Sequence, residues 1–283
     1  MSSVLQQQVE DGEFEVIVVN DSGAPLPKAA WQGAARLRVI DTGGHRERSV
    51  ARNTGAALAR GRYLHFLDDD DWLLPGALQV LFALAKQETA DWHYGGTRLL
   101  DGEGTPLVTL RHQLAGNGFL AAMAGEWIPL QASLIEAAAF FRAGGFNSLL
   151  AGPEDVDLLR RITLSGELAE TAAMVACVQW RTAGSTTDYE AHVDASRWAR
   201  EQIMDAAGVF SRMRSTADTA FWHGRMARIY LTSMVWNFRN RRALVATSRA
   251  LVGLFVVIRS GPRALLSPGF WQSLLNPYQS NAF

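Results

Sequence analysis

Short apolar segments alternate with helical segments over the first third of this 283-residue chain. Residues 14–20 (FEVIVVN), 36–40 and 63–67 are strand-like runs, and the first of them is rich in β-branched side chains. Residues 48–60 are rich in alanine at helical spacing, and residues 75–86 form a second helical segment that begins with a proline. This order of elements predicts an α/β fold with a mostly parallel sheet flanked by helices.

The pattern becomes less regular over residues 91–188, where a hairpin (residues 97–110), an extended segment, short helices and a final strand are expected. From Tyr189 onward every segment has helical periodicity. We therefore expect an α/β domain over residues 1–188, followed by an all-helical, arginine-rich region over residues 189–283.

Four consecutive carboxylates, Asp68–Asp71, follow directly after the third strand-like run. Like charges at this spacing repel and each resists desolvation, so solvent, a cation or a ligand that carries a cation must offset the cost. On an extended segment Asp68 and Asp70 share a face, and carboxylate oxygens there suit Mg²⁺ or Mn²⁺. A solvated acidic turn and the acidic loop of a phosphotransferase remain as alternatives. Because Asp21 ends another strand, it and the acidic run are expected to face one cleft.

The segment GPEDVDLL (residues 152–159) places Glu154, Asp155 and Asp157 in the first turn of a helix. The helix dipole stabilises negative charge there, so ordinary helix-start chemistry explains the three acids. The alternative is functional, because the dipole also keeps a carboxylate ionised while a substrate hydroxyl approaches, as a general base requires.

The composition, 48% hydrophobic and 19% charged, is that of a soluble globular protein with a substantial core. Cys177 is the single cysteine, so no internal disulfide forms, which fits a reducing compartment. The first residues lack the basic and apolar regions of a secretory signal. No stretch is expected to reach the roughly 18 apolar residues of a membrane-spanning helix, since the longest, residues 243–258, is interrupted by Thr247, Ser248 and Arg249. We therefore expect a cytoplasmic protein.

The formal net charge of −1 hides an asymmetry between the two parts of the chain. Residues 1–194 hold 25 of the 28 acidic residues, whereas residues 195–283 hold 12 arginines and three acids. Basic residues beside amphipathic helices with tryptophan suit an anionic membrane face, and a helical bundle packed on the acidic domain explains the same pattern. Peripheral attachment to the inner face of the plasma membrane is therefore an alternative localisation. We expect no nucleic-acid partner, because no nucleic-acid module accompanies the arginines.

Four longer segments follow one another in an order that is typical of one enzyme family. They are FEVIVVNDSG, SVARNTGAALARGRYLHFLDDDDWLLPGAL, WIPLQASLIEAAAFFRAGGFN and GPEDVDLLRRITLSGE. Together they resemble the successive motifs of family 2 glycosyltransferases with the GT-A fold. The resemblance covers roughly residues 3–188, two thirds of the chain.

The resemblance implies a role for each acidic residue at a matching position. Asp21 matches the aspartate that contacts the nucleotide base, and Asp155 matches the catalytic base. Asp68, Asp69 and Asp70 cover the D-x-D motif, in which Asp70 is the implied metal ligand and the other two bind the donor.

Two arginines complete the implied site. Arg52 matches a residue near the donor nucleotide and is equally placed to pair with the acidic run, and Arg181 falls where relatives carry a basic residue near the diphosphate or the acceptor. The implied reaction is inverting transfer of a sugar from a nucleotide-diphospho-sugar, most commonly a UDP-sugar, to a hydroxyl of a glycan or lipid-linked acceptor. Mg²⁺ or Mn²⁺ is the implied cofactor.

The chain departs from the family pattern at its beginning. Family members usually begin with a strand of the type V-S-V-I-I-P-x-Y-N, whereas this chain begins MSSVLQQQVEDGEFEV. Without that strand, two strands of the sheet would keep unpaired edges and the donor pocket would be incomplete. One rival hypothesis is therefore an inactive remnant of the GT-A fold that serves as a membrane-associated or partner-binding module. The other, a nucleotidyltransferase, is disfavoured because no glycine-rich phosphate loop is visible near the start.

Overall fold

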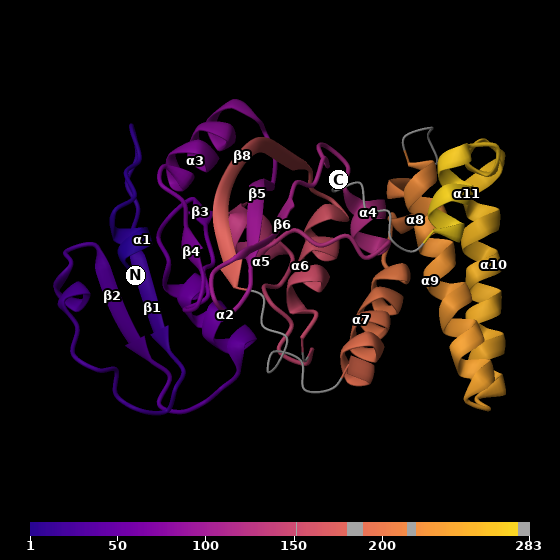
Figure 1. Cartoon of the computed structure of the whole chain (residues 1–283), viewed down its shortest axis with the longest axis horizontal. Helices are drawn as coiled ribbons and strands as arrows, with labels where there is room; N and C mark the ends of the chain where they lie inside the picture. The colour runs from indigo at the N-terminus through magenta and orange to yellow at the C-terminus, as the bar shows by residue number, and fades with distance from the viewer. Residues whose placement is uncertain (151, 180–188, 214–218, 277–283) are drawn as a thin grey trace. The chain divides into compact units, whose positions relative to one another are not determined.

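The computed structural model describes residues 1–150, 152–179, 189–213 and 219–276. The chain divides into two compact units (Figure 1). The first unit comprises Met1–Asn117 and Trp127–Ile203, and the second comprises Gly118–Glu126 and Met204–Phe283. Every described residue to which the sequence assigns a role in the site belongs to the first unit.

The first unit holds strands flanked by helices. Its strands are β1 (Val16–Asn20), β2 (Leu37–Asp41), β3 (Tyr63–Leu64), β4 (Trp72–Leu73), β5 (Trp92–Leu100), β6 (Pro106–Leu110), β7 (Ser133–Glu136) and β8 (Leu168–Gln179). Its helices are α1 (Ser2–Leu5), α2 (Arg48–Leu58), α3 (Ala77–Gln87), α5 (Ala137–Arg142), α6 (Glu154–Thr163) and most of α7 (Tyr189–Met204), with short 3₁₀ helices η1 (Ala30–Gly33) and η2 (Leu130–Ala132).

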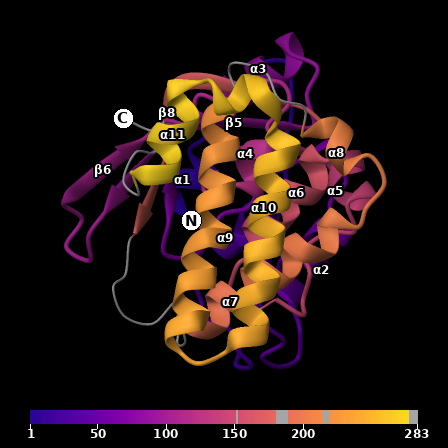
Figure 2. The ribbon, with the colours of Figure 1, turned by 90° about the vertical axis from the view of Figure 1, so that its right-hand side faces the viewer.

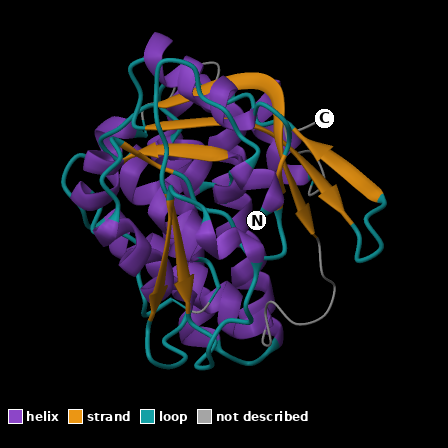
Figure 3. Ribbon diagram, turned by 90° about the vertical axis from the view of Figure 1, so that its left-hand side faces the viewer, coloured by secondary structure: helices purple, strands orange, loops and turns teal. Residues whose placement is uncertain are grey.

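The strands form two sheets, drawn in orange in Figure 3. β1 and β2 pair in parallel, with Val16 opposite Leu37 and Asn20 opposite Asp41. The larger sheet has the order β3-β7-β5-β8-β4, and β6 pairs with β5 outside this order. Among the described strands of the larger sheet, β5 and β8 run parallel and the other ladders are antiparallel.

The predicted α/β class is confirmed, but the larger sheet is mixed rather than mostly parallel. Alternating strands and helices predict parallel pairing only while a helix follows each strand. β6 instead follows β5 through the short turn Asp101–Gly104, which enforces antiparallel pairing. The hairpin expected over residues 97–110 is thereby confirmed, and it is one of the elements that make the sheet mixed.

The core of the first unit lies between α3 and the larger sheet. Leu78 and Leu81 on α3 are buried with Leu134 of β7 and Val175 of β8. Truncating a fully buried leucine such as Leu81 to alanine costs about 2–5 kcal/mol. This packing fixes β4 and β8, the strands that border the acidic run.

The second unit is helical in its described parts. Its helices are α4 (Phe119–Met123), α8 (Val209–Arg212), α9 (Ala220–Arg239), α10 (Ala243–Leu265) and α11 (Pro268–Leu275). α9 and α10 lie side by side along their lengths (Figure 2). α11 approaches α9 closely at Gly224, where an added Cβ would lie 2.1 Å from the Phe270 carbonyl oxygen. Because no side chain larger than hydrogen fits there, this glycine determines how closely the two helices pack.

The helix α10 corrects the expectation that no stretch is long and apolar enough to cross a membrane. It has 23 residues and meets the length and composition of a spanning helix, the one helix among the described residues that does so. Its Gly261 has a φ of +74°, so the helix is kinked at Gly261-Pro262. Thr247, Ser248 and Arg249 interrupt the apolar sequence, but the mean hydropathy of the helix still reaches that of a spanning helix.

Candidate functional site

The acidic run forms a turn between β3 and β4. The Asp71 amide donates to the Asp68 carbonyl over 3.2 Å, and β3 ends at Leu64 instead of continuing to Leu67 as expected. The carboxylates therefore lie in different environments: Asp69 is exposed, Asp68 and Asp70 are half-buried, and Asp71 is buried. The turn breaks the extended geometry on which the shared-face prediction for Asp68 and Asp70 was based.

Asp71 is a structural residue that the sequence left without a role. Its carboxylate accepts hydrogen bonds from the backbone amide of Gln179 (2.8 Å) and from Nε2 of Gln131 (2.7 Å). Burial raises the pKa of Asp71 to about 7, and repulsion from Asp68 and Asp70 adds to this, while the two hydrogen bonds oppose it. Asp71 thus fixes the turn to the end of β8.

Arg52 on α2 joins the acidic turn to the start of α6. Its Nη2 donates to Asp68 Oδ1 over 2.6 Å, and its Nη1 donates to Glu154 Oε1 over 2.9 Å. The sequence left open whether Arg52 pairs with the acidic run, and this pairing is confirmed. Burial lowers the pKa of Arg52, but the negative charges of Asp68 and Glu154 outweigh this effect. The net pKa is raised, so the guanidinium stays charged.

The position of α2 is fixed by the residue that follows Arg52. Asn53 donates from Nδ2 to the Phe146 carbonyl (2.8 Å) and accepts from the Phe146 amide (2.9 Å). Gly145 makes this approach possible, because its φ is +68° and an added Cβ would lie 2.7 Å from Asn53 Oδ1. The helix that carries Arg52 is therefore held against the backbone at Phe146.

Glu154 is the most buried acid of the cluster. It is 2% exposed, its Oε1 also lies 3.5 Å from Arg48 Nη1, and its Oε2 has no hydrogen-bond partner among the described residues. Burial raises the pKa of Glu154, as does the neighbouring Asp155, and Arg48 and Arg52 lower it. A buried oxygen without a partner is costly in a native structure and points to a function for this position.

Asp155, the predicted catalytic base, lies beside Glu154 with part of its surface open. Its Oδ2 accepts a hydrogen bond of 2.5 Å from Trp127 Nε1, and its Oδ1 accepts one of 2.7 Å from the Val156 amide. Burial raises the pKa of Asp155, opposed by these two hydrogen bonds and by the charge of Arg52. The indole fixes the orientation of the carboxylate.

Asp21 ends β1 as expected, and its carboxylate holds the loop that leads into α2. It accepts hydrogen bonds from Thr42 Oγ1 (2.8 Å) and from the backbone amides of Arg46 (2.9 Å) and Glu47 (3.0 Å). Burial raises the pKa of Asp21, but these hydrogen bonds outweigh it and hold the pKa below its ordinary value. Asp21 and the acidic turn therefore both connect to α2, Asp21 through the loop before it and Asp68 through Arg52.

Arg181, the second predicted arginine, lies outside the described residues. The last described residue before it, Gln179, is bonded to Asp71. Its assignment to the diphosphate or acceptor stays a prediction.

The acidic turn fits a divalent cation that arrives with phosphate oxygens. Among the described residues, no three or more His, Cys, Asp or Glu side chains form a group that could hold a metal ion by themselves. Mg²⁺, however, commonly binds through one or two carboxylates together with substrate phosphates and water. Asp68 and Asp70 both raise the pKa of Asp71, so the turn carries excess negative charge that Arg52, shared with Glu154, offsets only in part.

Two residues of the cluster were missed from the sequence. Gln131 donates from Nε2 to both Asp68 (3.0 Å) and Asp71 (2.7 Å), and Trp127 orients Asp155. Both lie in WIPLQASL, one of the segments that carry the resemblance. That segment marked the position, but only the tertiary structure shows which carboxylate each side chain reaches.

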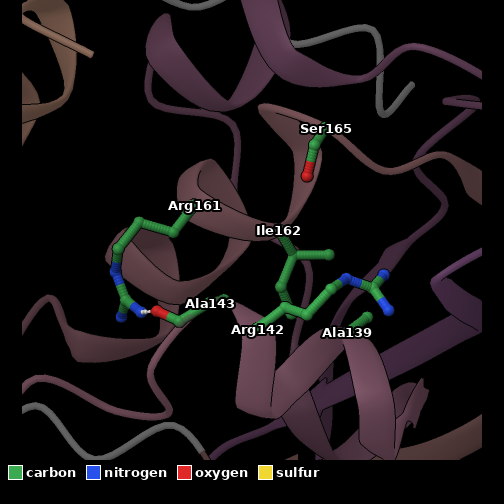
Figure 4. Close-up of a pocket in the computed structure, with 6 residues that line it drawn as sticks. All are labelled: Ala139, Arg142, Ala143, Arg161, Ile162 and Ser165. Atoms are coloured by element: carbon green, nitrogen blue, oxygen red, sulfur yellow. Dashed lines mark hydrogen bonds between the residues drawn. The ribbon is translucent and has the colours of Figure 1, made fainter. Parts of the chain in front are cut away.

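A separate pocket of about 350 Å³ lies between α5 and α6 (Figure 4). Its lining includes Arg142 and Arg161, but both guanidinium groups are engaged. Arg142 pairs with Asp91 at 2.6 Å, and Arg161 pairs with Asp157 at 2.6 Å and donates to the Ala143 carbonyl. The pocket contains none of the predicted site residues.

Comparison with solved structures identifies the fold. Residues 1–349 of TarS from S. aureus, crystallised with UDP-GlcNAc, superpose with a TM-score of 0.61 at 15% sequence identity, covering 93% of this chain and 77% of TarS 1–349. The same fragment crystallised alone gives a TM-score of 0.60 at 16% identity, covering 92% and 75%. At this identity the likeness establishes the fold, which agrees with the predicted GT-A architecture and helical C-terminal region.

Sequence relatives are glycosyltransferases. The poly(ribitol-phosphate) β-N-acetylglucosaminyltransferase TarP of Staphylococcus aureus (strain N315) is 32% identical over 96 residues, 32% of this chain and 29% of TarP. The uncharacterized glycosyltransferase EpsJ of Bacillus subtilis (strain 168) is 38% identical over 98 residues, 32% of this chain and 27% of EpsJ. The matched region thus spans less than a third of either relative.

The family assignment depends on a longer match. The model of glycosyl transferase family 2 matches residues 1–142, half of the chain, including Asp21, Arg52 and the acidic turn. The motifs that carried the resemblance and the match to the family model agree, and the chain belongs to glycosyl transferase family 2.

Proposed function

We propose that this protein is an inverting glycosyltransferase. It moves a sugar from a nucleotide-diphospho-sugar to a hydroxyl of a glycan or lipid-linked acceptor, with Mg²⁺ or Mn²⁺ at the acidic turn. The family assignment supports glycosyl transfer, and the details of the reaction are inferred from the residues of the cluster.

The observation that carries the proposal is the bridge made by Arg52. One guanidinium contacts both the turn that would hold the donor phosphates and the helix start that carries the base, at 2.6 and 2.9 Å. Transfer requires the donor and the base to be close together in a fixed geometry. The bridge brings Asp68 and Glu154, which are far apart in the sequence, into one cluster.

Asp155 acts as the general base. Trp127 orients its carboxylate, and burial raises its pKa, which makes it a stronger proton acceptor than an exposed aspartate. As the acceptor oxygen attacks the anomeric carbon opposite the leaving group, Asp155 Oδ takes the hydroxyl proton and the nucleoside diphosphate departs. One displacement inverts the configuration.

Asp70 would hold the divalent cation, and Asp68 and Asp69 would contact the donor. A cation bound there would neutralise charge on the diphosphate as it leaves. Arg52 and Gln131 hold Asp68 in place through hydrogen bonds of 2.6 and 3.0 Å.

A UDP-sugar is the favoured donor, because the fold is shared with TarS, which was crystallised with UDP-GlcNAc and with UDP. Asp21 is proposed to contact the base from the end of β1, and Arg181 to contact the diphosphate or acceptor. The cytoplasmic location stays a prediction, based on the single cysteine and its reducing compartment.

Release of UDP from a panel of UDP-sugars, with lipid-linked and soluble glycan acceptors, tests the proposal. Asp155→Asn should reduce turnover by roughly 10²–10⁴-fold while donor binding is retained. The matched control is Glu88→Gln, an exposed acid at the end of α3, which should not change the rate. Full turnover in Asp155→Asn would refute the assignment of the base. Absence of both donor binding and turnover in the unmodified protein would favour the inactive-remnant hypothesis.

A further inference from the structure

The second unit exposes large apolar side chains on its two long helices. Phe238 of α9 is 74% exposed, and on α10 the exposed fractions are 89% for Leu244, 56% for Leu254 and 65% for Ile258. Leu251, Leu254 and Ile258 follow one another at helical spacing, so they share one face. Contiguous apolar surface of this kind marks a site of interaction in a folded protein.

The opposite side of α10 is already used. Ala246, Gly253 and Val256 are buried, and an added Cβ at Gly253 would lie 3.3 Å from Tyr230 Cβ on α9. The exposed face therefore cannot turn inward without losing this contact. The exposed face of α10 is therefore accessible to a binding partner.

Charge determines the chemistry of that partner. Residues 219–283 contain eight arginines and no aspartate, glutamate or lysine. Arg239, Arg241 and Arg242 lie exposed at the α9–α10 turn, and Arg259 and Arg263 lie exposed near the other end of α10. The apolar face is thus bordered at both ends by cations, with no acid in this segment to pair with them.

Aromatic rings accompany the cations at both ends. The Arg242 guanidinium lies 5.2 Å from the Trp236 ring, and the Arg259 guanidinium lies 4.4 Å from the Phe210 ring. Tryptophan beside arginine is typical of the boundary between lipid headgroups and acyl chains.

We propose that this face, the exposed side of α9 and α10, lies flat on an anionic phospholipid bilayer. The apolar side chains would enter the acyl boundary while the terminal arginines contact lipid phosphates. A second copy of the chain is a poorer partner, because two faces bordered only by arginine repel each other. The proposal does not depend on the sugar-transfer chemistry.

The packing of α10 favours docking over spanning. α10 meets the length of a spanning helix, but its Arg249 is buried and its inner side packs along α9. A spanning α10 would place Arg249 in hydrocarbon and would expose to lipid the side that packs along α9, at high cost.

Co-sedimentation of the full chain with vesicles tests the proposal. Vesicles of phosphatidylglycerol mixed with phosphatidylcholine should bind the protein, and pure phosphatidylcholine vesicles should bind it far more weakly, with salt weakening the binding. Arg241→Gln with Arg242→Gln should lower the partition coefficient by about fivefold for each charge removed. Leu254→Glu should lower it by tenfold or more, since a charge replaces apolar contact.

Matched variants in the first unit serve as controls. Leu107 is 55% exposed, close to the 56% of Leu254, and Arg62 is an exposed arginine. Leu107→Glu and Arg62→Gln should leave vesicle binding unchanged. Equal binding to both vesicle types, equal effects of control and test variants, or no vesicle binding would each overturn the proposal. Self-association that Leu254→Glu abolishes, in the absence of vesicle binding, would assign the face to a second copy instead.

Discussion

The two units of the chain differ in where they place groups with an unfavourable solvation energy: one buries carboxylates, and the other exposes apolar side chains. The first unit buries carboxylates and balances them internally, with Arg52, Gln131 and backbone amides as partners. The second unit leaves large apolar side chains exposed and carries arginines that no acid after residue 218 can pair. The proposed donor site is stabilised by partners within its own unit, whereas the proposed docking surface is left exposed to solvent.

The largest stability effect should come from Arg52→Ala. This change leaves Glu154 buried without its hydrogen-bonded cationic partner, and breaking a buried ion pair costs about 3–5 kcal/mol. Denaturant unfolding of the variant measures the loss. Arg62→Ala is the control, because its 3.5 Å pair with Glu136 is exposed and should contribute about 0–1 kcal/mol. Similar losses in the two variants would show that the cluster is not internally balanced.

Gln131→Ala should have the next largest effect. The buried amide connects Asp68 and Asp71, and its loss leaves two carboxylate oxygens without that donor, at a cost of about 1–3 kcal/mol. Unfolding experiments with Gln87→Ala, an exposed residue at the end of α3, provide the reference. A loss of unfolding free energy no greater than that of the reference would show that Gln131 does not stabilise the acidic turn.

The two units should respond to pH with opposite sign. The pKa of Asp71 is raised from 3.8 to about 7, so its contribution to stability is present below pH 3.8 and is lost as the pH rises through 7. The pKa of buried His223 is lowered from 6.5 to about 4 by burial, so its contribution is present above pH 6.5 and is lost as the pH falls toward 4. Each group changes the unfolding free energy by at most about 1.4 kcal/mol per pH unit.

Unfolding free energies measured from pH 4 to 8 test this contrast. Asp71→Asn should flatten the decline toward pH 7, and His223→Phe should flatten the decline toward pH 4. If both variants flatten the same limb of the profile, the opposite signs assigned to the two units are wrong.

The smallest stability effect should come from the exposed apolar face. Leu254→Glu should change the unfolding free energy by no more than about 0.5 kcal/mol, because an exposed side chain away from special features contributes little to folding. The same variant should nevertheless reduce vesicle binding strongly. A loss of 2 kcal/mol or more would show that Leu254 belongs to the packed interior.

The sequence predicted elements better than contacts. Periodicity located α2 and α3 to within a few residues, and the motifs identified Asp21, Arg52, the acidic run and Asp155 as site candidates. The mixed order of the larger sheet was missed, because local pattern does not record which strand lies beside which. The partnership of Gln131 with Asp71, residues 60 positions apart, was missed for the same reason. Burial of Asp71 separates it from the three acids before it, and a run of identical residues cannot reveal that difference.

The central claim is that the Arg52-linked cluster is the donor and metal site. Thermal unfolding of the full chain with UDP, with and without Mn²⁺, tests it most directly, beside Asp70→Ala and the exposed control Asp11→Ala. Ligand at about 100 times its Kd adds about 2.7 kcal/mol, which should raise the Tm by roughly 5–10 °C for a protein of this size. We predict a Mn²⁺-dependent rise in Tm that Asp11→Ala keeps and Asp70→Ala loses. A rise independent of Mn²⁺, a rise that Asp70→Ala retains, or no rise with any nucleoside diphosphate would contradict it.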